Sequence, residues 1–340
     1  MMKTHRIFST GFALAFILSL SLSALADDGA TLPNYLPIPP VIKARILSVD
    51  PQKGYVVKEI KPHVYMITDG GYQSLFVTTG SGVILLDASP SFGSKIVQAV
   101  GEVTKERIKE LVYSHSHLDH ISGAVDVMKQ VPELKILAEE GSAAFLREKQ
   151  DPRRPLPTQT FKEQYTLKLG SATIEMKKGH WHSNEGDLFI YIPAAKVLMA
   201  IDTMPPGFAP FMDFDLTADF HNYLEMFDKL LAYDFDVLIG GHLSFPGNRN
   251  DVQVTKDYTM DVYQTVKRIH DGSDQMKIIS EAAAKYGWDN KMALFRTLLD
   301  PIIDQCAKEI EGRWSDKLAA VDVYAPSHCH TALIYSRWDD

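Results

Sequence analysis

Three histidines and one aspartate lie within six positions of this chain, between a predicted strand and a predicted helix. They are His115, His117, Asp119 and His120. The apolar segment Lys109–Ser114 precedes them as a strand, and Ser122–Gln130 follows with helical spacing. In an extended chain, residues two apart point to the same side, so His115 and His117 can bind one ion. Asp119 and His120 lie where the chain turns into the helix, and they can bind a second ion.

Three further strands end on residues of the same kind. Ala172–Lys177 leads to His180 and His182, Val197–Ile201 to Asp202, and Val237–Gly240 to His242. Strand ends in a layered sheet commonly lie along one edge, where loops build binding sites. A single histidine at a strand end is more often an ordinary core or surface imidazole than a ligand. Four such segments together predict a metal centre instead, and their imidazole and carboxylate ligands favour zinc, with iron or manganese as alternatives.

Strand and helix signals alternate in two blocks before the chain becomes helical. The first block contains the short apolar runs Val64–Thr68, Gln73–Thr79 and Val83–Asp87. Glycine turns divide these runs, as expected for consecutive antiparallel strands. We expect an α/β fold in which two mixed sheets pack face to face with helices outside. After Gly247, helical patterns at Val252–His270, Gln275–Lys285 and Lys291–Ile310 predict a C-terminal helical extension.

The candidate ligands and their surroundings resemble the metallo-β-lactamase superfamily. His115-x-His117-x-Asp119-His120 is similar to its signature, and Gly123 lies where the family usually has a glycine. The segment His182–Pro193, Asp202 after its strand, and Gly241-His242 are similar to its later motifs, in the same order. The resemblance covers about residues 55–247. It implies an αββα sandwich with the metals at one edge of the sheets, and it gives Asp87 a supporting role behind the ligands.

Position by position, the resemblance assigns ligands to two metal ions. His115, His117 and His182 would bind the first ion, Asp119, His120 and His242 the second, and Asp202 would bridge them. One departure concerns the third histidine, which the family usually places four residues before an Asp or Asn. His182 precedes Asp187 by five residues and His180 precedes it by seven. We favour His182, because one extra loop residue is easier to accommodate than three, and His180 is the alternative.

The resemblance implies a dinuclear zinc hydrolase. Two divalent cations about 3.5 Å apart lower the pKa of a shared water and so provide a hydroxide nucleophile. We expect cleavage of an ester, lactone, thioester or amide-like bond, including a β-lactam, with Asp119 as the catalytic residue that orients the nucleophile. Asp202 is typical of hydroxyacylglutathione hydrolases and lactonases, whereas zinc β-lactamases commonly have Cys or Ser there. The alternatives are an iron-dependent oxidoreductase acting on sulfur compounds or dioxygen, and a non-catalytic metal-binding envelope protein.

Composition and the first residues bear on partners and location. The 340 residues include 35 Lys+Arg and 43 Asp+Glu, a net charge of −8. This balance argues against a nucleic-acid partner and leaves a small-molecule substrate.

Residues 1–26 have the pattern of a secretory signal, with Lys3 and Arg6, the apolar run Phe12–Leu22, and Ala24-Leu25-Ala26 before Asp27. We expect a secreted protein, periplasmic in a Gram-negative source, without a stable membrane anchor after cleavage; an uncleaved anchor is the alternative.

The remaining segments give narrower predictions. A Pro-rich extended arm is expected at 27–54, the metallo-β-lactamase-like domain at 55–247, and the helical extension with a C-terminal tail at 248–340. Whether Cys306 and Cys329 form a disulfide stays open, as does the oligomeric state. The aromatic side chains Phe208, Phe211 and Phe214 would either line a substrate site or pack their loop onto the domain. The tract His328-Cys329-His330 is expected at the surface.

Overall fold

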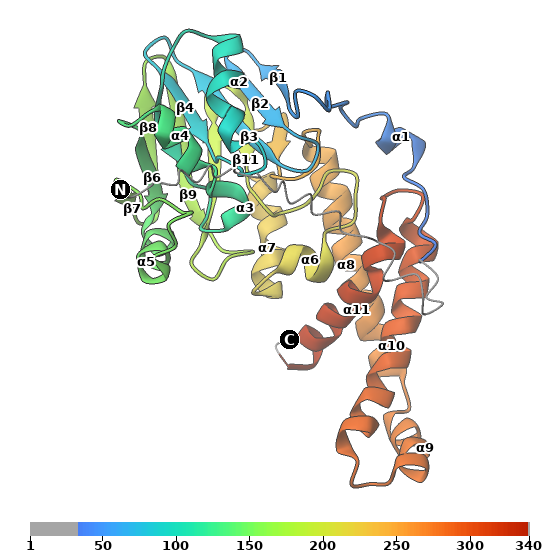
Figure 1. Ribbon diagram of the computed structural model, residues 1–340. Coiled ribbons are helices and arrows are strands. Elements are labelled where there is room, and N and C mark those ends of the chain that lie inside the picture. The colour runs from blue at the N-terminus through green and yellow to red at the C-terminus, as the bar shows by residue number, and fades with distance from the viewer. Residues whose placement is uncertain (1–32, 339–340) are drawn as a thin grey trace, which may run out of the picture. The chain divides into compact units, whose positions relative to one another are not determined.

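The computed structural model describes residues 33–338. The described residues from Leu36 onward form one compact unit, which contains all the helices and strands labelled in Figure 1. The predicted signal at 1–26 and the start of the predicted arm lie outside the described residues. The described part of the arm is irregular apart from the short helix α1 (Pro40–Lys43). Within residues 33–338, no helix combines the length and apolar character of a membrane span.

The first sheet has seven strands, which lie side by side in chain order. They are β1 (Val56–Lys61), β2 (Val64–Thr68), β3 (Gln73–Thr78), β4 (Val83–Leu86), β5 (Ile108–Val112), β6 (Lys135–Glu139) and β7 (Gln159–Phe161). β1 to β4 pair antiparallel, as predicted for β2 to β4, and β4 to β7 pair parallel. The sequence did not indicate β1 and β7, the two edge strands, because neither is a continuous apolar run.

The second sheet has five strands in the order β12-β11-β10-β9-β8. They are β8 (Gln164–Leu169), β9 (Ala172–Gly179), β10 (Asp187–Ile192), β11 (Val197–Met199) and β12 (Val237–Ile239). β11 and β12 pair parallel, and the other neighbours pair antiparallel. Both sheets are therefore mixed, as the sequence predicted.

Alternating side chains bury both faces of the sheets. In β4, Ile84 and Leu86 face the core between the sheets, whereas Val83 and Leu85 face the helices on the outer side. Helices α2 (Ile96–Val103), α4 (Ala124–Gln130) and α5 (Glu140–Lys149) pack on the outer face of the first sheet, and α7 (Phe220–Leu231) packs on that of the second. The fold is thus an αββα sandwich. Four short elements connect these layers: η2 (Gly93–Lys95), α3 (Leu118–Ile121), η3 (Pro193–Ala195) and α6 (Met212–Leu216).

Four helices follow the second sheet. They are α8 (Arg249–Gly272), α9 (Gln275–Tyr286), α10 (Lys291–Trp314) and α11 (Val321–Trp338). α8, α10 and α11 share the hydrophobic core on the outer face of the second sheet, and α9 packs on α10 (Figure 1). The disulfide Cys306–Cys329 joins α10 to α11, with Cα atoms 6.0 Å apart. The sequence predicted α8 to α10, whereas α11 lies where a tail was expected, because Pro326 and a buried histidine interrupt its apolar pattern.

Candidate metal centre

The ends of β4 and β5 are held together where the first ligand segment begins. Asp87, directly after β4, accepts a hydrogen bond from the backbone N–H of Ser114 at 2.8 Å. The N–H of Ala88 donates to the carbonyl oxygen of His120 at 2.9 Å. A Cβ atom at Gly123 would lie 2.6 Å from the carbonyl oxygen of Ala88, so glycine is required for this close approach. These contacts fix the loop that carries the first four candidate ligands.

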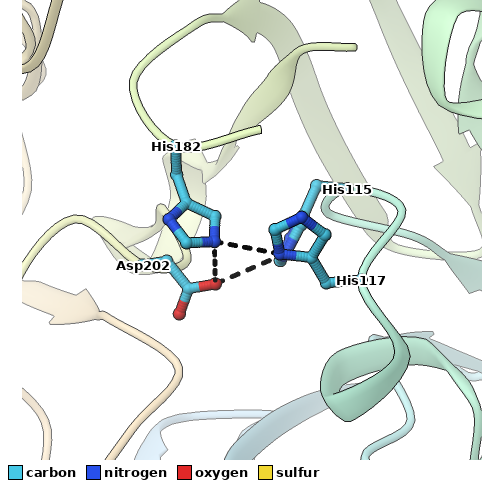
Figure 2. Close-up of side chains that lie close together, drawn as sticks. All are labelled: His115, His117, His182 and Asp202. Carbon is cyan, nitrogen blue, oxygen red and sulfur yellow. Dashed lines mark hydrogen bonds and ion pairs between the residues drawn. The ribbon is translucent and has the colours of Figure 1, made fainter. Parts of the chain in front are cut away.

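Side chains from three separate segments converge in a first group, His115, His117, His182 and Asp202, whose ligand atoms all lie within 4.8 Å of one another. Figure 2 shows their rings and carboxylate turned toward a common point. Nε2 of His182 lies 2.9 Å from Nδ1 of His117 and 3.3 Å from Oδ2 of Asp202. Nε2 of His115 lies 3.4 Å from the same oxygen. Ligands at about 2.0–2.1 Å from a tetrahedral zinc ion stand about 3.3 Å apart, so this spacing suits a metal ion.

Asp119, His120 and His242 form a second group with the same mutual spacing. Nε2 of His120 lies 3.5 Å from Oδ2 of Asp119. Asp202 lies between the groups: its Oδ2 faces the first group, while its Oδ1 is 3.3 Å from Nε2 of His120 and 2.9 Å from Nε2 of His242. One carboxylate thus presents one oxygen to each group, which is the arrangement that a bridging ligand requires.

Several buried atoms at this centre have no hydrogen-bond partner among the residues that the structure describes. They include Nε2 of His115 and Nδ1 of His120. Buried polar atoms without a partner cost free energy, and native proteins almost always satisfy them. Cations bound between the two groups would satisfy the nitrogens that face the centre, such as Nε2 of His115. The residues present therefore fit a metal centre.

A family model described as the metallo-beta-lactamase superfamily matches residues 67–242. The chain belongs to this superfamily. The match includes every residue of the two groups. The resemblance and the fold predicted from the sequence are thereby confirmed.

Comparison with individual proteins gives similarities at low sequence identity. The chain is 25% identical over 190 residues to the 2,4-dinitroanisole O-demethylase subunit alpha of Nocardioides sp. (strain JS1661). That match covers 54% of this chain and 56% of the relative, so it spans about half of the relative's length. Among solved structures, a metallo-beta-lactamase from Pontibacter korlensis superposes with a TM-score of 0.52 at 19% identity, covering 60% of this chain and 97% of that chain. The structural likeness shows the fold alone.

The buried groups at the centre shift one another's pKa values. Burial lowers the pKa of His115 well below its ordinary value, and burial also lowers that of His117, so both rings are neutral and able to bind a cation. Burial opposes protonation of His120 as well, but the charge of Asp202 raises the pKa of His120 to about 9. Burial would raise the pKa of Asp202, yet His120 and His242 hold it well below its usual range.

His182 is oriented by its loop and by a contact behind its ring. The carboxylate of Asp187 accepts hydrogen bonds from the backbone N–H groups of Trp181 and His182, at 2.8 and 2.9 Å. Nδ1 of His182 lies 2.5 Å from the carbonyl oxygen of Asp215. Because a carbonyl oxygen only accepts, the proton is on Nδ1, and Nε2 presents its lone pair to the centre. His180, the alternative third histidine, is half-buried and belongs to neither group.

Asp215 lies in a stretch of left-handed backbone. Asp213, Phe214, Asp215 and Leu216 all have φ between 54° and 57°. This conformation costs about 1–2 kcal/mol for each residue other than glycine, so other contacts must hold it. Helix α11 supplies them: the ring of His328 stacks on the ring of Phe214 with centroids 4.2 Å apart, and Oγ of Ser327 accepts from the N–H of Asp213 at 3.1 Å.

His328 is fully buried, which corrects the prediction that its tract lies at the surface. Its Nε2 donates to the carbonyl oxygen of Phe211 at 3.0 Å, and its Nδ1 accepts from the hydroxyl of Tyr258 at 2.7 Å. Burial lowers the pKa of His328 to about 4, so the ring is neutral. Cys329 is buried as well, and His330 alone in the tract is exposed. No local signal identified this role, because His328 acts on a loop more than 100 residues away.

A cavity of about 590 Å³ lies over the two groups. The candidate ligands that line it are His117, Asp119, His182, Asp202 and His242. Much of the remaining lining is apolar and includes Phe208, Phe211, Leu216 and Tyr324. Of the three phenylalanines considered from the sequence, Phe208 and Phe211 therefore face the cavity, while Phe214 is buried against His328.

Proposed function

We propose that the protein is a metal-dependent hydrolase that cleaves an ester, lactone, thioester or amide-like bond. The observation that carries this proposal is Asp202, whose two oxygens face separate groups of imidazoles beside a cavity of substrate size. When bound, a pair of divalent cations supplies a hydroxide nucleophile near neutral pH and polarises the substrate carbonyl. Membership of the metallo-β-lactamase superfamily supports the same conclusion.

The chain's own residues would hold the reacting groups. We assign His115, His117 and His182 to one ion and Asp119, His120 and His242 to the other, with Asp202 between them. Asp119 lines the cavity and its side chain is 43% exposed. This position suits a group that orients the attacking water and passes its proton to solvent. The buried carboxylate of Asp87 would keep the loop of the first ligands in place through Ser114.

Zinc is the metal that we propose, with two ions per chain. The ligand atoms are imidazole nitrogens and carboxylate oxygens, which suit zinc and also iron or manganese. Elemental analysis of the purified protein separates these cases. About two zinc ions per chain support the proposal, whereas bound iron together with oxygen consumption would favour an oxidoreductase on the same scaffold. Bound metal without turnover of any substrate or consumption of oxygen would favour a non-catalytic metal-binding envelope protein.

The decisive test compares two histidines of one loop. His182→Ala removes a proposed ligand, and His180→Ala is a matched control two residues away that belongs to neither group. With a panel of lactone, thioester, aryl ester and cephalosporin substrates, we expect His182→Ala to lose about 100-fold or more in kcat/KM, because several kcal/mol of transition-state stabilisation depend on the ions. His180→Ala should keep its activity, and circular dichroism should show both variants folded. Equal turnover by the wild type and His182→Ala would contradict the proposal.

The name of one relative favours a second reaction at the same site. Hydroxide attack on the methoxy-bearing ring carbon of 2,4-dinitroanisole would release methanol and 2,4-dinitrophenol, which balances as a hydrolysis. We propose this as an additional activity, supported by the 25% identity to a 2,4-dinitroanisole O-demethylase subunit. The coloured dinitrophenolate gives a direct assay of this chain alone. Product formation no faster than in a blank, at full metal occupancy, would exclude it.

We also propose that the protein is secreted and acts in the periplasm of its source. The support is the signal pattern at residues 1–26 and the disulfide Cys306–Cys329, since disulfides persist in oxidising compartments. N-terminal sequencing of the protein from a periplasmic fraction should begin at Asp27. Recovery of the uncleaved chain in the membrane fraction would favour an anchor instead.

A further inference from the structure

We propose that the cavity selects uncharged substrates with an aromatic or similarly bulky apolar group beside the bond to be cleaved, and that Tyr324 of α11 is a specificity-determining residue. The inference rests on the proposed hydrolase function and names the substrate class of the same site. It concerns the part of the cavity away from the two ligand groups. Two observations support it: an aromatic wall built from distant segments, and the charges around the cavity.

Aromatic side chains from two distant segments meet at the cavity. Phe208 and Phe211 come from the loop after Asp202, and Tyr324 comes from the first turn of α11. The rings of Phe211 and Tyr324 lie 5.2 Å apart with planes at 63°, an edge-to-face contact. Phe211 is 45% exposed and Leu216 is 50% exposed, in a chain whose large apolar side chains are mostly buried. Apolar surface is therefore left uncovered at this part of the cavity, where an apolar ligand would bury it.

The wall is formed before any ligand binds, because backbone hydrogen bonds join its two segments. The N–H of Ala209 donates to the carbonyl oxygen of Ala319 at 2.8 Å. The N–H of Ala319 donates to the carbonyl oxygen of Gly207 at 3.0 Å. This pair of bonds places Phe208 beside the turn that leads into α11. A preformed wall lowers the ordering cost of binding, so a flat apolar group gains affinity from it.

The charges around the cavity disfavour anionic substrates. Among the described residues that line it, none is a lysine or an arginine. Two arginines close to the site are already engaged: Arg154 donates to the carbonyl oxygen of Ser116 at 2.9 Å, and Arg45 pairs with Asp251 at 2.7 Å. Asp119 and Asp202 would offset the charge of the ions that we assign to them, so Asp215 is the carboxylate of this lining that faces the cavity without being a proposed ligand.

A carboxylate on the substrate, away from the scissile bond, would therefore lose water without gaining a cationic partner. Leaving such a charge unpaired in an apolar site is unfavourable. A cephalosporin, which carries a carboxylate, should be a poor substrate, and a neutral aryl ester or lactone should be a good one. The cavity volume of about 590 Å³ is within the range that holds small molecules of this kind.

A matched pair of substrates tests the charge selection on the zinc-loaded protein. Methyl 4-acetoxybenzoate and 4-acetoxybenzoate carry the same acetyl ester, and the carboxylate of the second adds one negative charge across the ring. Because their phenolate leaving groups differ in basicity, each kcat/KM is divided by the rate constant of the same compound with free hydroxide. We expect the normalised kcat/KM for acetyl ester cleavage of the neutral compound to be about tenfold or more above that of the anion. Equal values, or a preference for the anion, would overturn the inference.

Two variants test the aromatic wall, with an unrelated exposed aromatic as control. Tyr324→Ala and Phe211→Ala should raise KM for phenyl acetate by about tenfold while leaving kcat/KM for ethyl acetate nearly unchanged, since ethyl acetate lacks the ring that the wall holds. Trp288→Ala changes a 53% exposed side chain outside the cavity lining and should match the wild type with both esters. An equal loss with phenyl acetate and ethyl acetate would contradict a role in specificity.

Binding separates failure of this inference from failure of the proposed function. If no ester, lactone or thioester is hydrolysed at full metal occupancy, the hydrolase proposal fails. Calorimetric titration of the purified protein with N-phenylacetamide and with 4-acetamidobenzoate then still measures the selection. Tighter binding of the neutral compound, weakened in Tyr324→Ala, supports the inference, and binding of the anion at least as tight overturns it.

Discussion

His182 donates a hydrogen bond from Nδ1 to the backbone carbonyl oxygen of Asp215, and this contact ties a candidate metal ligand to a helix far along the chain. Asp215 keeps its position because the left-handed stretch around it is held by His328 of α11. The carbonyl fixes the tautomer of His182, so the orientation of its Nε2 depends on packing more than 140 positions later in the sequence. The C-terminal helical extension is thus part of the support of the metal centre.

Replacing His328 should therefore weaken metal binding without touching a ligand. We expect His328→Ala to lower zinc affinity by about 10- to 100-fold, as loss of a group that orients a ligand does. His330→Ala, an exposed neighbour on the same helix, should leave the affinity unchanged. Chelator competition measures the affinity, and the absorption of the cobalt-substituted protein reports the ligand geometry. An unchanged cobalt spectrum in a folded His328→Ala protein would show that α11 does not position His182.

Burial of His328 also makes stability depend on pH. Its folded pKa is about 4, against about 6.5 in the unfolded chain. Between these values the unfolded state binds more protons, so the stabilisation is complete above about pH 6.5 and is lost as pH falls toward 4. The full loss from this one group is about 3 kcal/mol. Urea unfolding of chelator-treated protein from pH 7.5 to 5 should show a flatter pH profile for His328→Gln than for the wild type, and parallel profiles would contradict this.

The sandwich fold and all the candidate ligands followed from local patterns in the sequence. Strands such as β4 are short apolar runs, and His115, Asp202 and His242 each lie three residues after the end of a strand, β5, β11 and β12. The supporting contacts did not follow, because they use groups that carry no signal of their own. The hydrogen-bond partner of His182 is the backbone carbonyl of Asp215. The left-handed stretch around Asp215 contains no glycine that would have indicated positive φ. Tertiary packing alone explains why a histidine of α11 is buried there.

The disulfide beside His328 should contribute measurably to stability. Cys306 and Cys329 are 23 positions apart and join α10 to α11. Closing a loop of this length stabilises a fold by about 3 kcal/mol in the chain-entropy account. The double variant Cys306→Ala, Cys329→Ala should have a free energy of unfolding lower by that amount at pH 7, and so a lower urea midpoint. The wild type in a reductant should move to the same midpoint, and a double variant as stable as the oxidised wild type would show that packing alone holds α11 in place.

A single methyl group at Gly123 should disrupt the loop that carries the first ligands. The Cβ of an alanine there would lie 2.6 Å from the carbonyl oxygens of Ala88 and Ser89, which are backbone atoms fixed by β4 and by the bond from Ala88 to His120. We expect Gly123→Ala to lose at least one zinc ion per chain and about 2 kcal/mol or more of stability, because the loop must shift to relieve the overlap. Gly101→Ala is the matched control: Gly101 lies in α2, nothing lies within 4 Å of its Cβ position, and alanine there should stabilise the helix by up to about 1 kcal/mol. Zinc content and urea midpoints of the two variants give the comparison, and a Gly123→Ala protein with full zinc and wild-type stability would show that the loop does not depend on this close approach.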